Sequence, residues 1–345
     1  MHYQNVIMES MGTALPEERW SSAEIEKRLE PLYSRLKLNE GRLEHMTGIQ
    51  ERRVWPENTR PSDASAAAGR EVLQHSSFER SEIDLLIHCA VSRNRLEPAT
   101  AANVHDALDL STHAQIMDIS NACLGFLNAM AVAGSLIQCG HIKTALITAG
   151  ENGRPLIEET IEQLNAQHLT RKTVKPWFAN LTVGCASVAA IVTHEKYLRK
   201  EPLFSLHSAH SQTNSSAHQL CEGDSASGSL TMQTDSEQLL EKGVALAEDT
   251  WRNFCRHTGW NNDTPDHIIC HQVGKQHQRA LYQALELDMN KDHSTFPYLG
   301  NCGAASLPAT LSIVESNRAF SPADKLSLLG IGSGLSSMMM GLTRA

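Results

Sequence analysis

The stretch that decides the fold runs from Met117 to Phe126 and reads Met-Asp-Ile-Ser-Asn-Ala-Cys-Leu-Gly-Phe. The apolar-rich run over 115–119 predicts a strand, and the chain then turns sharply through Ser-Asn-Ala at 120–122. From Cys123 onward, apolar residues recur at the spacing of a helix. The sequence therefore predicts a strand, a tight turn and a helix in direct succession.

Cys123 stands at this turn and is the first candidate for a catalytic nucleophile. On the first turn of a helix, the unpaired backbone N–H groups and the positive end of the helix dipole favour thiolate over thiol. The small neighbours Ala122 and Gly125 leave room for a substrate carbonyl to approach the sulfur. A buried, inert cysteine is the alternative, and this stretch alone leaves both interpretations open.

Composition and charge limit the possible classes of function. The chain has 345 residues, which fits two packed halves, and its net charge is −9 with no basic run of five or more. These features disfavour a nucleic-acid or anionic-membrane partner. The eight cysteines form no Cys-x-x-Cys pair, so a zinc ribbon and a disulfide scaffold are also disfavoured. The first ten residues do not resemble a signal peptide, and no window reaches the ~18 apolar residues of a membrane span, so we expect a cytoplasmic protein.

Strands alternate with helices along the whole chain. Nearly continuous apolar runs at 83–91 and 145–149 are typical of buried parallel strands, and helical patterns lie between them. This alternation predicts an α/β fold with a parallel sheet. The same order of elements resumes after about residue 236, which predicts two similar halves, 1–195 and 196–345. We expect the polar stretch 207–235 to be a surface excursion between them.

Two further polar residues follow predicted strands, where sites in α/β proteins tend to form. His271 follows the apolar run 267–270, and Asn301 lies in the segment Gly-Asn-Cys-Gly at 300–303. A Cys, a His and an Asn can perform acyl transfer, with the thiolate attacking a thioester and the other two donating hydrogen bonds to an enolate or oxyanion. Each also has an ordinary alternative, as one of 17 mostly solvated histidines and as a turn asparagine. The glycine loop 330–334 lies between two strands, so it does not predict a dinucleotide site.

Several motifs in this order make the sequence resemble the thiolase superfamily, in particular its ketoacyl-ACP synthase III branch. The matching segments are Thr47-Gly48-Ile49-x-Glu51-Arg52-Arg53, Asp118-Ile119-x-Asn121-Ala122-Cys123-x-Gly125-Phe126, His271-Gln272, Gly300-Asn301-x-x-Ala304-Ala305-Ser306-x-Pro308 and the terminal glycine loop. The resemblance implies a five-layered αβαβα thiolase fold from two similar halves, an obligate homodimer and no cofactor beyond an acyl-CoA substrate. It also implies that Cys123 carries the acyl group and that His271 and Asn301 stabilise the enolate. The backbone N–H groups of Cys123 and Ser333 would form an oxyanion hole.

Within this branch, the sequence is most similar to the OleA group of head-to-head acyl-CoA condensing enzymes. This resemblance rests on Val91-Ser92-Arg93-x-x-Leu96-Glu97-Pro98-x-Thr100, Asn121-Ala122-Cys123-Leu124, Leu181-Thr182-x-Gly184-Cys185, His271-Gln272-Val273 and Gly330-Ile331-Gly332-Ser333-Gly334-Leu335. It implies a non-decarboxylative Claisen condensation of two long-chain acyl-CoAs to a 2-alkyl-3-ketoacyl product, with downstream enzymes of a hydrocarbon pathway as partners. It also implies that Glu97 reaches the partner subunit's site as the base, which makes chemical sense because joining two plain acyl-CoAs requires removal of an α-proton.

Three alternatives remain at this point. A decarboxylating 3-oxoacyl-ACP synthase III, or an acyltransferase that moves the acyl group from Cys123 to an alcohol or amine, would not need Glu97. A non-catalytic scaffold of the same fold would not need to retain Cys123, His271 and Asn301 together. The departures from the family pattern at Gly274 and Cys302 leave the preferred acyl chain length open.

Overall fold

The computed structural model describes residues 1–224 and 230–345 and contains a nine-stranded sheet in the order β11-β12-β13-β8-β1-β7-β6-β4-β5. One part of the sheet holds β1 (Val6–Ala14), β4 (Leu85–His88), β5 (Gln115–Asp118), β6 (Thr144–Glu151) and β7 (Ala186–His194). The other part holds β8 (Phe204–Thr213), β11 (His267–Cys270), β12 (Lys325–Gly332) and β13 (Ser336–Arg344). The two parts meet where β1 pairs with β8, through Ile7 with Ser205 and Met8 with Phe204.

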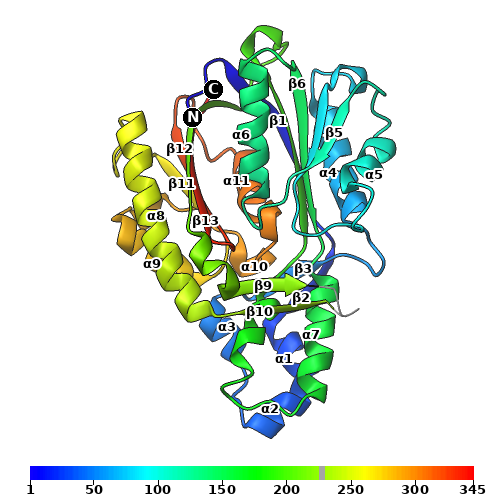
Figure 1. Cartoon of the computed structure of the whole chain (residues 1–345), viewed down its shortest axis with the longest axis vertical. Helices are drawn as coiled ribbons and strands as arrows, with labels where there is room; N and C mark the ends of the chain where they lie inside the picture. The colour runs from blue at the N-terminus through cyan, green and yellow to red at the C-terminus, as the bar shows by residue number, and fades with distance from the viewer. Residues whose placement is uncertain (225–229) are drawn as a thin grey trace.

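The helices turn these two parts into five layers (Figure 1). The outer layers are α4 (Pro61–His75) with α5 (Thr100–Ala107) on one side and α8 (Ser236–Thr258) with α9 (Lys275–Leu285) on the other. The central layer is α6 (Gly125–Gln138) with α11 (Ser306–Ser316). The layers therefore follow the order αβαβα, which confirms the predicted fold.

The central helix α6 is apolar on most of its surface because it is packed between the two parts of the sheet. Phe126, Leu127 and Met130 of this helix are at most 2% exposed and share one hydrophobic core with Met338 and Met340 of β13. A helix that is hydrophobic all round is stable only when it is buried in this way. This packing fixes the start of α6, and with it the turn that carries Cys123.

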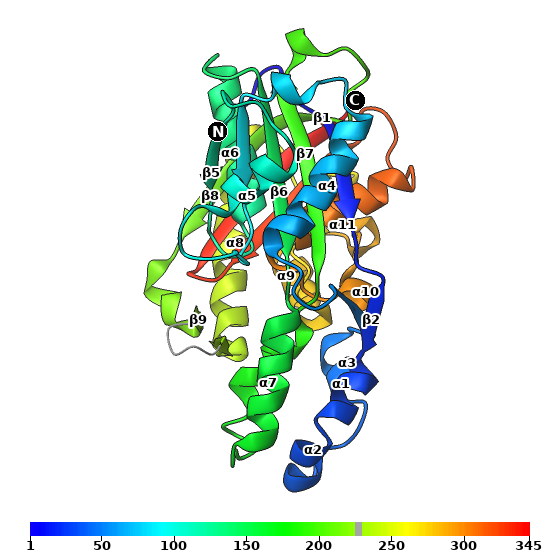
Figure 2. The same cartoon turned by 90° about the vertical axis from the view of Figure 1, so that its right-hand side faces the viewer.

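A smaller group of elements lies below the sheet (Figure 2). It consists of α1 (Ser22–Arg28), α2 (Glu30–Leu36), α3 (Arg42–Thr47), α7 (Arg154–Ala166), α10 (Phe296–Leu299) and two small two-stranded sheets, β2 (Glu18–Ser21) with β3 (Glu51–Val54) and β9 (Cys221–Asp224) with β10 (Thr231–Thr234). Short 3-10 helices cover Arg80–Glu82, Lys175–Thr182, Glu195–Tyr197, Ser215–Leu220, Met289–Lys291 and Gly303–Ala305. Among the residues that the structure describes, no helix is both long enough and apolar enough to cross a membrane.

One predicted segment differs from the structure. The surface excursion predicted over 207–235 is wrong for its first part, since β8 continues to Thr213 inside the sheet. Residues 225–229 lie outside the described part of the chain. The boundary between the halves at residue 195 stays a prediction.

Candidate active site

Cys123 lies in a tight turn between β5 and α6. Ala122 adopts a left-handed backbone conformation (φ 46°), and its carbonyl accepts the N–H of Gly125 at 3.2 Å. The Asn121 side chain donates to Asn128 of α6 at 2.8 Å and ties the turn to the helix. The helix begins at Gly125 and not, as predicted, at Cys123, so the cysteine is half-buried just before the helix.

The electrostatics of Cys123 also differ from the sequence-based expectation. Burial raises the pKa of the Cys123 thiol, and the negative charge of Glu151 raises this pKa further. The prediction that the helix start favours the thiolate is therefore wrong for this site. The sulfur is a thiol at neutral pH, and its proton must move when it attacks a substrate.

His271 lies directly after β11, where its backbone N–H donates to Leu329 of β12 at 2.9 Å. The next side chain, Gln272, fixes the following segment by accepting the backbone N–H of Thr295 at 2.8 Å and of Phe296 at 3.1 Å. Burial, and the positive charge that His277 can carry, lower the pKa of His271 to about 4. Its Nδ1 atom has no hydrogen-bond partner among the described residues. His271 is therefore a neutral imidazole at pH 7, and its unpartnered Nδ1 atom can form a hydrogen bond with a ligand.

The Asn301 loop is held from both sides. The Asn301 backbone N–H donates to Thr182 at 2.8 Å, and its carbonyl accepts the N–H of Gly184 at 2.9 Å. A Cβ atom at Gly184 would lie 1.9 Å from the carbonyl oxygen of Leu299, so this approach requires glycine. The amide oxygen of the side chain accepts the backbone N–H of Gly303 at 3.0 Å, which orients the amide and leaves its nitrogen as a donor.

Backbone contacts bring these segments together. A Cβ atom at Gly125, next to the Cys123 turn, would lie 3.4 Å from the Cβ atom of Ala304 in the Asn301 loop. A Cβ atom at Gly332 would lie 3.3 Å from the Asn121 carbonyl oxygen, so the terminal glycine loop also packs on the Cys123 turn. His271 follows the strand beside the one that leads into this glycine loop. The assignment of the Ser333 backbone to an oxyanion hole stays a prediction.

Glu97 is placed differently. It lies in an exposed loop next to Leu96, which is 91% exposed, and no hydrogen bond or ion pair of Glu97 is found among the described residues. The loop that carries it is anchored after Glu97, because the Asp118 carboxylate accepts the backbone N–H groups of Thr100 at 2.7 Å and Ala101 at 2.8 Å. The structure therefore presents Glu97 at the surface of this chain.

Glu151 was not among the predicted site residues; it is a buried carboxylate at the end of β6 whose charge acts on Cys123. A charged residue at the carboxyl end of a buried strand is the signal that could have identified it. No group of three or more His, Cys, Asp and Glu residues is placed to hold a metal ion within the described ranges.

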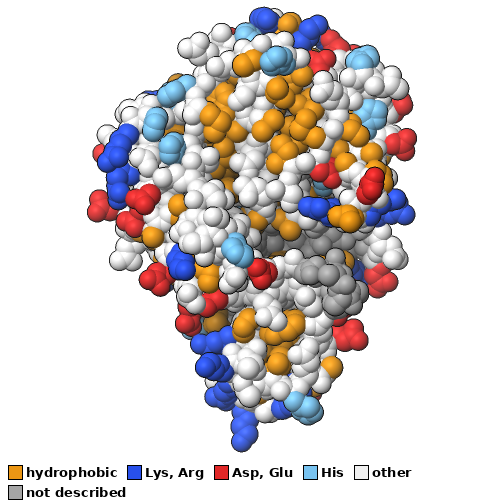
Figure 3. Space-filling model, in the orientation of Figure 1, with side chains coloured by type: hydrophobic (Ala, Val, Ile, Leu, Met, Phe, Trp, Pro, Cys, Tyr) orange, Lys and Arg blue, Asp and Glu red, His pale blue; other side chains and the backbone are white. Residues whose placement is uncertain are grey.

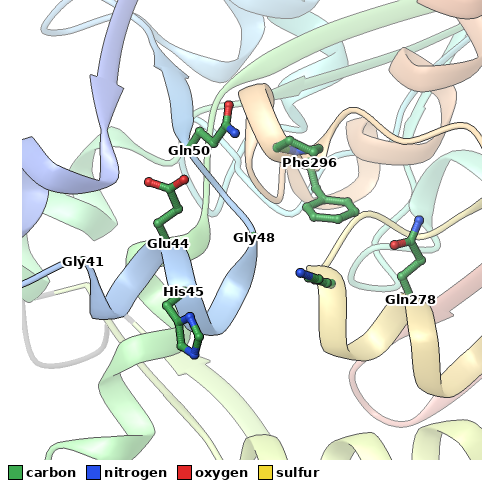
Figure 4. Close-up of a pocket in the computed structure, with 9 residues that line it drawn as sticks. Gly41, Glu44, His45, Gly48, Gln50, Gln278 and Phe296 are labelled. Atoms are coloured by element: carbon green, nitrogen blue, oxygen red, sulfur yellow. The ribbon is translucent and has the colours of Figure 1, made fainter.

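A cavity of about 650 Å³ lies between α3 and α9 (Figure 4). Glu44 and His45 line it from α3, and Gln278 and Lys275 line it from α9. Phe296, which also borders this cavity, donates its backbone N–H to Gln272. The cavity thus lies next to the segment that follows His271, and none of the four predicted catalytic residues lines it.

Comparison with known proteins places this arrangement in a family. Residues 117–165 match the family model of 3-oxoacyl-[acyl-carrier-protein] synthase III, and residues 255–342 match the model of its C-terminal part. The chain is 35% identical to an acyl-CoA:acyl-CoA alkyltransferase of Shewanella oneidensis, over 99% of both chains. It is 32% identical to the enzyme of the same name from Xanthomonas campestris pv. campestris, over 98% of both chains. This chain belongs to the acyl-CoA:acyl-CoA alkyltransferase family.

Solved structures agree with this placement. A variant of Xanthomonas campestris OleA with bound lauric acid and lauroyl-CoA matches with a TM-score of 0.94 and 31% identity, over 99% of both chains. The cerulenin-bound structure of the same protein matches with a TM-score of 0.95, over 99% of this chain and 98% of that one. The chain is thus a thiolase-fold, acyl-transferring condensing enzyme similar to OleA and to 3-oxoacyl-ACP synthase III.

Proposed function

We propose that this enzyme joins two long-chain acyl-CoA molecules head to head in a non-decarboxylative Claisen condensation. The observation that carries the proposal is the packing of the Cys123 turn against the Asn301 loop and the glycine loop that runs beside His271. The names of the related alkyltransferases, and lauroyl-CoA bound to OleA, support acyl-CoA as the substrate. The product would be a 2-alkyl-3-ketoacyl-CoA.

In the first step, the sulfur of Cys123 attacks the thioester carbonyl of one acyl-CoA. A bond from carbon to Cys123 forms, the bond to the CoA sulfur breaks, and the thiol proton finally resides on the released CoA. Because burial favours the neutral forms of both Cys123 and His271, we propose that no thiolate–imidazolium pair forms before this attack. The backbone N–H groups of Cys123 and Ser333 would bind the carbonyl oxygen as it becomes negative.

In the second step, the partner subunit's Glu97 removes an α-proton from the second acyl-CoA. Hydrogen bonds from neutral His271 and from the Asn301 amide stabilise the enolate oxygen that results. The α-carbon then attacks the acyl group on Cys123, and the bond to the sulfur breaks. The proton taken by Glu97 returns to the Cys123 thiolate, so the site is ready for a second cycle.

The surface of the chain supports the proposal of a second subunit. Glu97 is exposed, and hydrophobic side chains gather on the face that carries α6 and β5 (Figure 3). Ile116 on the edge strand β5 is 40% exposed and Val132 on α6 is 38% exposed. An apolar face beside an unpaired sheet edge is typical of a subunit interface, so we propose a homodimer in which Glu97 completes the partner's site.

We also propose that the reaction needs no cofactor beyond acyl-CoA and takes place in the cytoplasm. Downstream enzymes of an olefin-forming pathway would then take up the product.

The variant Glu97→Gln tests this function, because it keeps the shape of the side chain and removes its basicity. We expect it to acylate Cys123 normally but to lose both condensation and the exchange of acyl-CoA α-protons with deuterated solvent. Glu17→Gln, at another exposed glutamate, should behave as the wild type. Condensation by Glu97→Gln at the wild-type rate would exclude Glu97 as the base. A requirement of the wild type for a malonyl thioester would favour the decarboxylating synthase.

A further inference from the structure

Glu151 is a buried charged residue that the proposed mechanism does not use. It ends β6 and is 4% exposed. Its carboxylate accepts three backbone N–H groups, from Val91 at 2.8 Å, Ala304 at 2.9 Å and Ser92 at 3.0 Å. No lysine or arginine forms an ion pair with it in the part of the chain that the structure describes. Burying a carboxylate is costly, and here three backbone donors offset that cost in place of a cation.

Two of these donors belong to the loop that carries Glu97. Val91 and Ser92 form the start of this loop, and the hydroxyl of Ser92 also accepts the backbone N–H of Asn152 at 3.2 Å. The end of the loop is held by Asp118, as described above. Glu151 is therefore the anchor at the start of the loop, and Asp118 is the anchor at its end.

The third donor belongs to the loop that carries Asn301. Ala304 donates its N–H to Glu151, and its neighbour Gly303 donates to the amide oxygen of Asn301 at 3.0 Å. A Cβ atom at Gly303 would lie 2.6 Å from Oε1 of Glu151, and Gly303 has a φ of 52°. Position 303 thus requires glycine, because any side chain would collide with the Glu151 carboxylate. The same turn fixes the Asn301 amide and contacts Glu151.

We propose that Glu151 is a positioning residue that sets the Glu97 loop and the Asn301 amide at fixed places relative to the Cys123 turn. This inference rests on the proposed condensation, because both groups act in its second step. A neutral side chain could not accept from all three donors, since glutamine offers one acceptor oxygen where the carboxylate offers two. The negative charge has a consequence of its own, because after burial it is the main cause of the raised pKa of Cys123.

Two variants separate the reach of the side chain from its charge. Glu151→Asp keeps the charge but is about 1.5 Å shorter, so it cannot reach all three donors. Glu151→Gln keeps the length, loses the charge and turns an amide N–H2 toward a backbone donor. Glu162→Gln, at an exposed position of α7, is the matched control. Three properties are measured: Cys123 acylation by acyl-CoA, condensation, and the pH profile of Cys123 alkylation by iodoacetamide.

We expect condensation to fall roughly 10- to 100-fold in both Glu151 variants while acylation changes less than about threefold, because the displaced groups act in the second step. The alkylation profile should shift to lower pH in Glu151→Gln and stay in place in Glu151→Asp and Glu162→Gln. A purely structural role would reduce both half-reactions equally and leave the profile unchanged, and that result would overturn the inference. Condensation by either Glu151 variant at the wild-type rate would overturn it as well.

The design remains decisive if one variant is unstable. Should Glu151→Gln fail to fold, Glu151→Asp alone decides through the ratio of its condensation and acylation rates. A wild-type enzyme that forms no product from acyl-CoA contradicts the proposed function instead, and in that case the inference fails with it. If the wild type condenses acyl-CoA and Glu151→Asp does so equally well, the inference about Glu151 is contradicted and the proposed function is not.

Discussion

At the scale of single residues, burial drives Cys123 and His271 toward their neutral forms. It raises the pKa of the thiol and lowers the pKa of the imidazole to about 4. A thiolate–imidazolium pair would need the opposite shifts, so the resting site holds a thiol and a neutral histidine. A neutral histidine is suited to donating a hydrogen bond to an enolate oxygen without giving up its proton.

Cys123 should become acylated by acyl-CoA, and Cys123→Ser should abolish the acyl-enzyme because serine lacks a comparably nucleophilic form at neutral pH. Mass spectrometry detects the acyl mass gain. Cys123 and Cys139 fall in one tryptic peptide, so fragment ions must assign the position. The exposed Cys139 provides the control, because Cys139→Ser should acylate normally. An acyl group on Cys139 or Cys302 would refute the assignment.

His271→Ala should reduce condensation about 100- to 1000-fold, the usual loss for one donor that stabilises a developing negative charge. Acylation of Cys123 should fall much less, because the enolate forms only in the second step. Single-turnover acylation and steady-state condensation measure the two effects separately. An equal loss of both half-reactions would contradict the enolate role, and Asn301→Ala should repeat the pattern.

The lowered pKa of His271 also predicts how its contribution to stability depends on pH. The unfolded chain binds a proton to this histidine below about pH 6.5, whereas the folded chain binds it only near pH 4. The unfolded state is therefore favoured as pH falls from 6.5 to 4, and stability is lost in that window. His271→Ala should flatten this part of the pH profile of the melting temperature, while His141→Ala, at an exposed site, should leave it unchanged. A profile as steep as that of the wild type would contradict the buried neutral state.

At the scale of elements, Arg52 joins the two-stranded sheet of β2 and β3 to the Asn301 region. This arginine is fully buried and donates to the carbonyl oxygen of Leu181 at 2.9 Å and to the Ser22 hydroxyl at 3.1 Å. Burial lowers the pKa of Arg52 to about 10. Leu181 precedes Thr182, whose carbonyl oxygen accepts the backbone N–H of Asn301. Arg52 therefore stabilises the segment to which the Asn301 loop is hydrogen-bonded.

Arg52→Met should lower the free energy of unfolding by about 2–4 kcal/mol, because it leaves buried acceptors without donors. Chemical denaturation measures this difference. Arg19→Met removes an ion pair to Glu51 in which Arg19 is 57% exposed, so it should cost less than about 1 kcal/mol. Equal effects of the two substitutions would show that burial of Arg52 contributes nothing.

The elements also show what the sequence could and could not predict. The change of period from strand to helix around Cys123 is local, so β5 and α6 were predictable to within a few residues. The strand β8 was missed because Ser and His make up much of its sequence, and Ser208 is buried only because it lies inside the sheet. Cys123, His271 and Asn301 were identified through motif order. The role of Glu151 depends on donors far apart in the chain, which no local pattern reveals.

At the scale of the whole molecule, the proposed homodimer would cover an apolar face of the chain. Ile116 on the edge strand β5 and Val132 on α6 are both exposed. Figure 3 shows hydrophobic side chains gathered on the face that carries these two elements. The proposed base Glu97 is exposed on the same chain. In the proposed mechanism, condensation therefore depends on dimer formation, since its second step needs residues of both subunits.

Light scattering should find a homodimer at micromolar concentration, and Ile116→Lys combined with Val132→Lys should shift the enzyme to a monomer by burying charge at the interface. The monomer should still acylate Cys123 but condense poorly, because the partner subunit's Glu97 is missing. Met289→Lys, at an exposed methionine outside this face, should remain dimeric. A wild-type monomer that condenses acyl-CoA at full rate would contradict the shared site.

The central claim is that two acyl-CoA molecules are joined without a malonyl donor. Mass spectrometry of the products from purified enzyme and acyl-CoAs of several chain lengths tests it most directly. We expect a product that contains both acyl chains and one CoA, or its hydrolysed acid, and no product from Cys123→Ser. Formation of a carbon–carbon bond only after a malonyl thioester is added would contradict the proposed condensation.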